Sequence, residues 1–113
     1  MLVIGSGARE QALAWRLAAS PSVSELIAAP GNPGILGIGR CLPVPADDLK
    51  GQARLAREEN VDLTVVGSEV QYAAGIVDLF RKEKRLIFGP TAKAARLESS
   101  KAFAKRLMTK HRI

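Results

Sequence analysis

Short apolar runs alternate with stretches of helical spacing along the chain. Runs of apolar and often β-branched side chains predict strands, and they lie at residues 1–4, 26–29, 41–44, 63–66 and 86–88. The run at 41–44 is the weakest of the five. The run at 63–66 is the clearest, because it is flanked by Asp62 and Gly67, and we expect it at the centre of a sheet.

Between these runs, apolar residues recur one helical turn apart. Helices are therefore predicted over 9–19, from Asp47 or Asp48 to about residue 60, over 70–82, from a Thr91 cap to about residue 97, and over 101–110. In the helix over 70–82 the spacing predicts that one face is buried, formed by Ala73, Ile76, Val77 and Phe80. The turn-forming cluster at 30–34 ends the second strand and predicts a loop.

This alternation of strands and helices with short connections predicts an α/β fold. We expect a Rossmann-like parallel sheet of about five strands with helices on both faces. In such sheets ligands bind at the carboxyl ends of the strands, near the point where the strand order reverses. Three loops follow strands at that edge, residues 5–10, 30–34 and 67–69. We expect them to converge into one candidate site.

The composition bounds the protein's size and class. With 113 residues and 47% hydrophobic residues, the chain can form one compact domain. No apolar run approaches the roughly 20 residues that span a bilayer, and no secretory signal peptide is expected at the amino terminus. The single cysteine, Cys41, cannot form an internal disulfide and is typical of a reducing cytoplasm. No His is near Cys41 in the sequence, which makes it a poor candidate nucleophile.

The formal charge of +6 is unevenly distributed. Residues 81–113 contain eleven of the 17 basic and two of the 11 acidic residues, a net +9, which leaves −3 for residues 1–80. A basic segment can bind nucleic acid, or it can face an acidic or phosphate-bearing partner located elsewhere. Phe103 is its one aromatic residue, so stacking on bases is poorly supported.

The loop at residues 5–10 reads GSGARE. A dinucleotide-binding loop has Gly or Ala at the third glycine position, where this chain has Glu10, and the second strand does not end in a carboxylate. These departures argue against a nicotinamide or flavin site, and no Gly-Lys-Ser/Thr motif follows a glycine loop. The backbone N–H groups beside Arg9 suit a single phosphate. Alternatively, Gly5 and Gly7 only permit a tight turn, and Arg9 and Glu10 are solvated.

Two further loops carry candidate polar groups. Glu69 follows the strand at 63–66 and could accept hydrogen bonds from ribose hydroxyls. It could also simply complement the dipole of the next helix, which contributes about 0.3–1 kcal/mol. Asn32 and its neighbouring glycines could contact a small ligand through the backbone, but a plain turn explains them equally well.

Four stretches carry a family resemblance: VIGSGARE with ALAW, APGNPG, DLTVVGSE with AGIVDLFR, and IFGPTAKAARLESSKAFAKRLM. Together they resemble the amino-terminal part of the phosphoribosylamine–glycine ligase (glycinamide ribonucleotide synthetase) family, in the ATP-grasp superfamily. They follow family order over nearly the whole chain, with family-like spacing except around residues 35–48. The set is specific, although no single motif is.

The resemblance implies a fold, a reaction and a site. The family joins 5-phosphoribosylamine to glycine through a glycyl-phosphate intermediate in de novo purine biosynthesis, using ATP with Mg²⁺ or Mn²⁺ and releasing ADP and phosphate. The implied substrate-binding residues are Gly5, Gly7, Ala8, Arg9 and Glu10 on the phosphate side, Pro30, Gly31 and Asn32 lining the pocket, Gly67, and Glu69 facing the ribose. Lys105 matches a position expected to approach ATP phosphate, or with Lys101 it only forms a solvated helical face. The resemblance assigns no catalytic residue and no metal ligand to this chain.

Several positions depart from the family pattern. Ala8 replaces a glycine and Gln11 replaces a histidine. Ser68 and residues 70–72 replace a proline-rich stretch, and Ser99 and Arg112 replace glycines. These changes, Ala8 and residues 68–72 most of all, bear on the substrate geometry.

The resemblance covers about the first quarter of a family enzyme. It implies a substrate-binding (pre-ATP-grasp) domain at 1–98 and the start of a connection into an ATP-grasp domain at 99–113. We expect a binding domain that is inactive alone, either an excised fragment or a separately encoded product. Its expected partners are the rest of the ligase or a second copy through an exposed carboxyl segment, with no nucleic acid and no membrane. The alternative is a non-catalytic basic module that binds nucleic acid or an acidic partner.

Overall fold

The apolar runs form the strands of one parallel sheet. In a computed structural model that describes all 113 residues, the strands are β1 (Leu2–Gly5), β2 (Ile27–Pro30), β3 (Arg40–Cys41), β4 (Thr64–Val66) and β5 (Ile87–Phe88). Their order in the sheet is β3-β2-β1-β4-β5, and all neighbours are parallel. This confirms the predicted α/β class and five-stranded sheet. The middle strand is β1, however, and β4 lies beside it.

The third strand is shorter than the predicted 41–44. After Cys41, the Leu42 N–H still donates to the Ala28 carbonyl at 2.9 Å. Val44, the next residue whose N–H would face β2, instead donates to the Leu42 carbonyl at 2.8 Å, so the chain turns out of the sheet. The pairing therefore ends two residues into the run.

The chain forms seven helices: α1 (Ala8–Ala18), α2 (Pro33–Leu36), α3 (Leu49–Glu58), α4 (Glu69–Ala73), α5 (Ile76–Lys82), α6 (Ala92–Ser99) and α7 (Lys101–His111). Helix α2 begins within the predicted 30–34 loop and continues beyond it. Asn32 Oδ1 accepts from the Ile35 N–H at 3.2 Å, and Pro33 suits the first helical position.

The helix predicted over 70–82 is broken in two. Gly75 adopts a φ of 95°, a left-handed conformation that glycine tolerates and that interrupts a right-handed helix. Because of this break, the shorter helix α4 does not continue the face of α5 that packs on the sheet. Ile76, Val77 and Phe80 are fully buried as predicted, but Ala73 is exposed. The prediction for Ala73 was wrong because it assumed one continuous helix.

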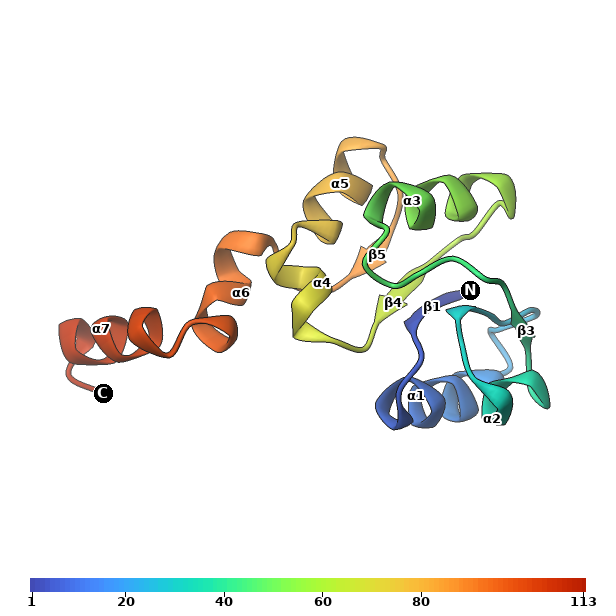
Figure 1. The fold of residues 1–113 in the computed structure, drawn as a ribbon, viewed down its shortest axis with the longest axis horizontal. Coiled ribbons are helices and arrows are strands. Elements are labelled where there is room, and N and C mark those ends of the chain that lie inside the picture. Colours follow the sequence, from blue (N-terminus) through green and yellow to red (C-terminus); the bar gives the residue numbers. More distant parts are fainter.

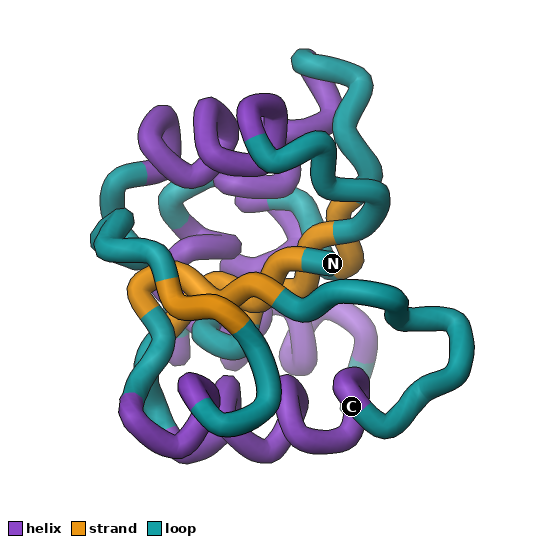
Figure 2. The backbone as a smooth tube through the Cα atoms, turned by 90° about the vertical axis from the view of Figure 1, so that its right-hand side faces the viewer, coloured by secondary structure: helices purple, strands orange, loops and turns teal.

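Helices cover both faces of the sheet (Figure 2). Side chains alternate along each strand, so β1 directs Leu2 and Ile4 to one face and Val3 to the other. Leu2 and Ile4 pack in a cluster with residues of α3 and α5, including Phe80. Val3 packs with Ala14 of α1 and other residues of α1 and α2. The two cores lie on opposite sides of the sheet.

The two last helices form an arm that extends from the body (Figure 1). Helix α6 packs on α4, and its first N–H, from Ala92, donates to Asp78 Oδ2 at 2.9 Å. Helix α7 packs on α6, where the guanidinium of Arg96 lies 4.2 Å from the centre of the Phe103 ring. No residue of α7 is buried. The molecule measures 46 Å along its longest axis.

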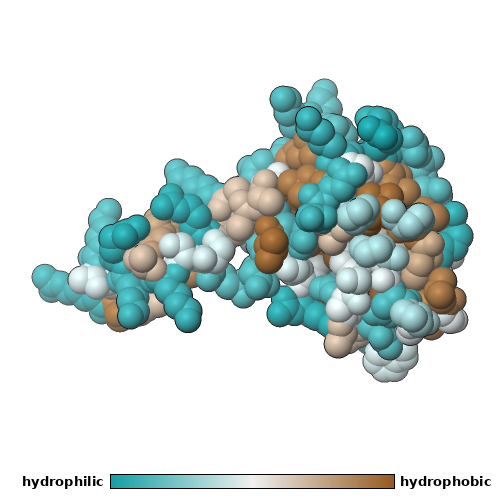
Figure 3. Space-filling model, viewed as in Figure 1, coloured by the Kyte–Doolittle hydropathy of each residue, from teal (hydrophilic) through white to brown (hydrophobic).

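The arm's surface is mixed, with hydrophilic residues around small apolar patches (Figure 3). Met108 is exposed, as expected for a segment that lacks a partner. Phe103 and Leu107 are half-buried rather than exposed, because they share an apolar depression with Ala94 and Leu97 of α6. None of the helices combines the length and the apolar character that crossing a membrane requires.

Candidate functional site

The three predicted loops meet at the carboxyl edge of the sheet. Gly5 at the end of β1 is in register with Pro30 at the end of β2, and the Gly31 N–H donates to the Gly5 carbonyl at 3.1 Å. On the other side of β1, the Gly67 N–H donates to the Ile4 carbonyl at 3.4 Å. The strand order reverses between β1 and β4, which is where such sheets bind ligands. The predicted convergence is confirmed.

Arg9 bridges two of these loops from the first turn of α1. Its Nη1 donates to the Gly67 carbonyl at 2.6 Å and pairs with Glu69 Oε2 at 3.4 Å. The pair is largely exposed, so it contributes little to stability. The pKa of the Glu69 carboxyl is lowered, first by its own backbone N–H and then by Arg9. Glu69 is therefore ionised at neutral pH, with Arg9 as its counter-charge.

Glu10 is buried, with 6% of its surface exposed. Its Oε2 accepts a 2.6 Å hydrogen bond from the Gly7 N–H, so the carboxylate folds back under the glycine loop. The alternative in which Glu10 is solvated is therefore wrong. The Gly7 N–H already has an acceptor within the protein.

Asn32 fixes the third loop against the first. Its Nδ2 donates to the carbonyls of Ser6 at 3.0 Å and Gly7 at 3.4 Å, while its Oδ1 caps α2. Gly31 adopts a φ of 72°, and a Cβ there would collide with the Cys41 thiol. Glycine is therefore required at position 31, beside an asparagine that holds two loops together.

A cavity of about 290 Å³ opens at this junction. Its lining consists of Gly7, Ala8, Arg9, Glu10, Ser68 and Glu69. The other predicted residues support the cavity from the neighbouring loops and do not line it: Gly5, Pro30, Gly31, Asn32 and Gly67. The sequence reasoning did not select Ser68, although its place between Gly67 and Glu69 would have indicated it.

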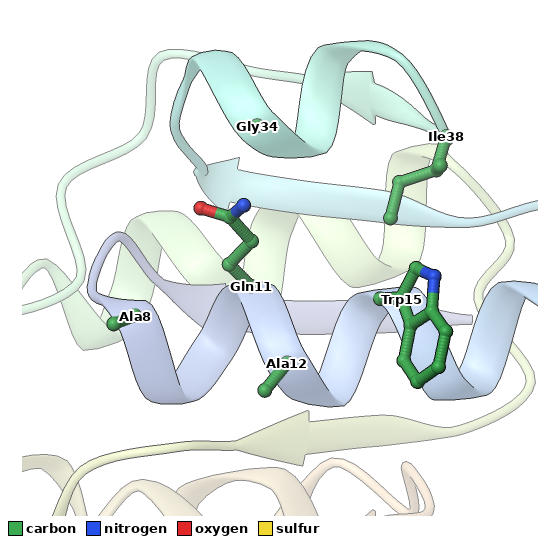
Figure 4. A pocket seen from close by; sticks show the side chains of 6 residues that line it. All are labelled: Ala8, Gln11, Ala12, Trp15, Gly34 and Ile38. Carbon is green, nitrogen blue, oxygen red and sulfur yellow. The ribbon is translucent and has the colours of Figure 1, made fainter.

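A second cavity, of about 340 Å³, lies between α1 and α2 (Figure 4). Gln11 extends toward α2 there, and Trp15 stands beside it with 67% of its surface exposed. Ala8 is the one residue that lines both cavities. The family resemblance expects histidine where Gln11 stands, so this departure lies in the second cavity and not in the first.

Lys105 is not part of the junction of the three loops. It is exposed on α7, at the other end of the molecule from α1 (Figure 1). No three His, Cys, Asp or Glu side chains lie close enough together to hold a metal ion.

A family model described as "Phosphoribosylglycinamide synthetase, N domain" matches residues 1–98. The chain belongs to this family. The chain is 56% identical over its whole length to a phosphoribosylamine–glycine ligase of Xylella fastidiosa (strain 9a5c), of which it covers 26%. It is 53% identical to the enzyme of the same name from Xanthomonas campestris, of which it covers 27%.

A crystal structure of a phosphoribosylamine–glycine ligase from Thermotoga maritima has the same fold. It aligns with 99% of the present chain at a TM-score of 0.67 and 29% identity, and the alignment covers 25% of the Thermotoga maritima chain. The present chain thus spans about a quarter of the length of these relatives. The comparisons confirm the family resemblance, and nothing in them supports a basic interaction module.

Proposed function

We propose that this chain is the phosphoribosyl-binding part of a phosphoribosylamine–glycine ligase. In the longer protein, 5-phosphoribosylamine and glycine are condensed at the expense of ATP in de novo purine biosynthesis. Membership of the N-domain family and the names of the similar ligases support this reaction. A cytoplasmic location of such an enzyme is consistent with its single cysteine, which forms no disulfide.

The observation that carries the proposal is the bridge made by Arg9 at the junction of the loops. Its guanidinium joins the glycine loop to Gly67 and Glu69 beside a cavity of about 290 Å³, near the lower end of the range of small-ligand sites. The first-turn N–H groups of a helix have no carbonyl one turn earlier. A phosphate at Ala8 and Arg9 would supply acceptors for them and for the guanidinium.

Glu69 lies on the other side of this cavity from the glycine loop. An ionised carboxylate is an acceptor only, which suits hydroxyl groups and not a phosphate. A phosphate beside Arg9 and a ribose beside Glu69 therefore give each group of the ligand a complementary partner. Asn32 contributes indirectly, because it holds the carbonyls of the loop in place.

ATP and its Mg²⁺ or Mn²⁺ belong to the longer protein in this proposal. When bound, they supply the phosphoryl group that activates glycine. No three His, Cys, Asp or Glu side chains of this chain lie close enough together to hold the metal. Lys105, on the arm, remains the candidate to approach an ATP phosphate. The isolated chain is expected to bind the phosphoribosyl group without ligase activity.

Titration calorimetry with ribose 5-phosphate tests the proposal on the chain itself. Arg9→Ala should weaken binding about tenfold or more, because a charge-assisted hydrogen bond contributes about 1.5–3 kcal/mol. Arg16→Ala is the matched control, since Arg16 lies on the same helix in its last turn and outside the cavity. It should bind like the wild type.

The proposal fails if the wild type shows no saturable heat with ribose 5-phosphate. It also fails if Arg9→Ala and Arg16→Ala lose affinity to the same extent. That result would indicate that the overall positive charge attracts the ligand without a specific site. Ribose without phosphate should bind more weakly than ribose 5-phosphate, because only the phosphate engages Arg9.

A further inference from the structure

The side chain of Glu10 is enclosed by glycines from two loops. A Cβ at Gly5 would lie 2.5 Å from Glu10 Cγ, and one at Gly7 would lie 2.8 Å from Oε2. A Cβ at Gly67 would lie 2.5 Å from Glu10 Cδ. All three distances are shorter than real contacts allow. The glycines therefore leave a socket that the Glu10 side chain fills.

Gly67 shows most directly what this socket requires. Gly5 has a φ of 130°, which favours glycine whatever surrounds it. Gly67 does not have a positive φ, so its backbone conformation does not call for glycine. The three atoms nearest to its hypothetical Cβ all belong to Glu10. The contact with Glu10 therefore explains why glycine stands at position 67.

Glu10 and Arg9 hold the same residue from two sides. Glu10 packs against the Cα of Gly67, and Arg9 donates to the Gly67 carbonyl at 2.6 Å. At the same time Glu10 holds the glycine loop through the Gly7 N–H at 2.6 Å. One buried carboxylate therefore fixes how far the glycine loop lies from the turn that carries Glu69.

We propose that Glu10 is a positioning residue, whose buried carboxylate sets the spacing between the glycine loop and the Gly67–Glu69 turn. Glu10 lines the cavity, but its carboxylate is engaged by the Gly7 N–H, so in this proposal it acts through Gly7 and Gly67 and not through a hydrogen bond to the phosphoribosyl group. The ligand-binding consequence rests on the proposed function, whereas the spacing is a property of the free chain. The site is accordingly formed before the ligand arrives.

The first test reads the socket without any ligand. Gly67→Ala should lower the Tm of the chain by about 5 °C or more, since the methyl group displaces the carboxylate. In a Glu10→Ala background the same change should leave the Tm unchanged or raise it, because alanine restricts the unfolded chain more than glycine does. Either Glu10→Ala or Gly67→Ala should speed hydrogen exchange at the Gly7 amide. Equal costs of Gly67→Ala in both backgrounds would overturn the proposal.

The second test separates positioning from support of the fold and from direct contact with the ligand. Glu10→Gln retains an oxygen that can accept from Gly7, so it should bind ribose 5-phosphate within about threefold of the wild type. Glu10→Ala should lose about tenfold at a temperature where it is fully folded. If folded Glu10→Ala binds ribose 5-phosphate as tightly as the wild type, Glu10 only supports the fold. If Glu10→Gln and Glu10→Ala lose the same affinity, the negative charge of Glu10 contacts the ligand directly. Either result overturns the proposal.

A wild-type chain that fails to bind ribose 5-phosphate would refute the proposed function. The Tm values of Gly67→Ala in the two backgrounds and the Gly7 exchange rates would still decide whether Glu10 sets the spacing of the loops. The two failures are therefore distinguishable.

Discussion

Gln52 allows the clearest prediction about how the core supports the site. The side chain is fully buried, and its Nε2 donates to the carbonyls of Ala29 at 3.2 Å, Val44 at 3.0 Å and Pro45 at 3.0 Å. Its Oε1 has no partner. Helix α3 is thereby tied to the end of β2, immediately before the loop that carries Asn32. Two substitutions test the hydrogen bonds of this side chain: Gln52→Leu and Gln52→Glu.

The cost of Gln52→Leu follows from the groups that it leaves unpaired. Nε2 has two hydrogens, so at most two of the three carbonyls receive a full hydrogen bond at once. An unpaired buried polar group costs about 1–3 kcal/mol. Leucine removes the side-chain donor from the Ala29 and Val44 carbonyls, whereas the Pro45 carbonyl keeps the Asp48 N–H at 3.1 Å. It also removes one unpaired oxygen, so the net loss is about 1–3 kcal/mol of unfolding free energy. The change in volume is small and adds little.

Gln52→Glu should be worse at neutral pH. An ionised carboxylate has no donor and would face carbonyl oxygens in a buried site, which raises the pKa of the introduced carboxyl above its unfolded value of about 4.3. Protonation restores one donor. The variant is therefore most stable, relative to Gln52→Leu, below about pH 4.3, and it loses that stability as the pH rises through the raised pKa.

Urea denaturation followed by far-ultraviolet circular dichroism measures these free energies. Gln11→Leu is the control, because the same substitution at an exposed position should change stability by no more than about 0.5 kcal/mol. The reasoning is refuted if Gln52→Leu is as stable as the wild type. It is also refuted if Gln52→Glu at neutral pH is no less stable than Gln52→Leu.

Three further predictions concern the loops, the sheet edge and the arm. Asn32→Ala should cost about 1 kcal/mol or more in chemical denaturation, because the Ile35 N–H loses its cap and the Ser6 and Gly7 carbonyls lose a donor; unchanged stability would contradict a capping role. Burial raises the pKa of Tyr72 above 10.0, so ultraviolet absorbance of this sole tyrosine should show a midpoint above that value. The stability contributed by the neutral phenol is complete below about pH 10 and is lost as the pH rises through the raised pKa, and Tyr72→Phe should abolish that loss. Deleting residues 101–113 should change the Tm by less than about 2 °C, since α7 buries no residue, and should reduce self-association in sedimentation; a large drop in Tm would show that the arm supports the body.

The strands were predictable because each is an apolar run whose neighbours in sequence are polar or turn-forming. The continuous apolar run of Leu2, Val3 and Ile4 already indicated a strand covered on both faces. The errors arose where a local turn interrupts an apolar pattern. The chain turns out of the sheet after Leu42, where the Val44 N–H donates to the Leu42 carbonyl, and Gly75 divides a run whose apolar spacing continues across it. Helix α2 was predictable in retrospect, because asparagine followed by proline is a frequent start of a helix.

The meeting of the three loops was predictable from topology, since parallel strands bring their carboxyl ends to one edge. The role of Glu10 was not. In the sequence it stands beside Arg9 as an ordinary charged residue, and only its fit against Gly67, far along the chain, explains its burial. The role of Gln52 could not be predicted for the same reason. The carbonyls that accept its hydrogen bonds lie together only in the folded protein.

The most direct test of the account is a nuclear magnetic resonance titration of the isotope-labelled chain with ribose 5-phosphate. The account predicts saturable shifts of the amides of Ala8 and Arg9 together with those of Ser68 and Glu69, with one shared dissociation constant. The amides of residues 101–113 should stay unchanged. Shifts confined to the basic arm, or to the glycine loop without the turn after β4, would contradict a single phosphoribosyl site formed by these loops.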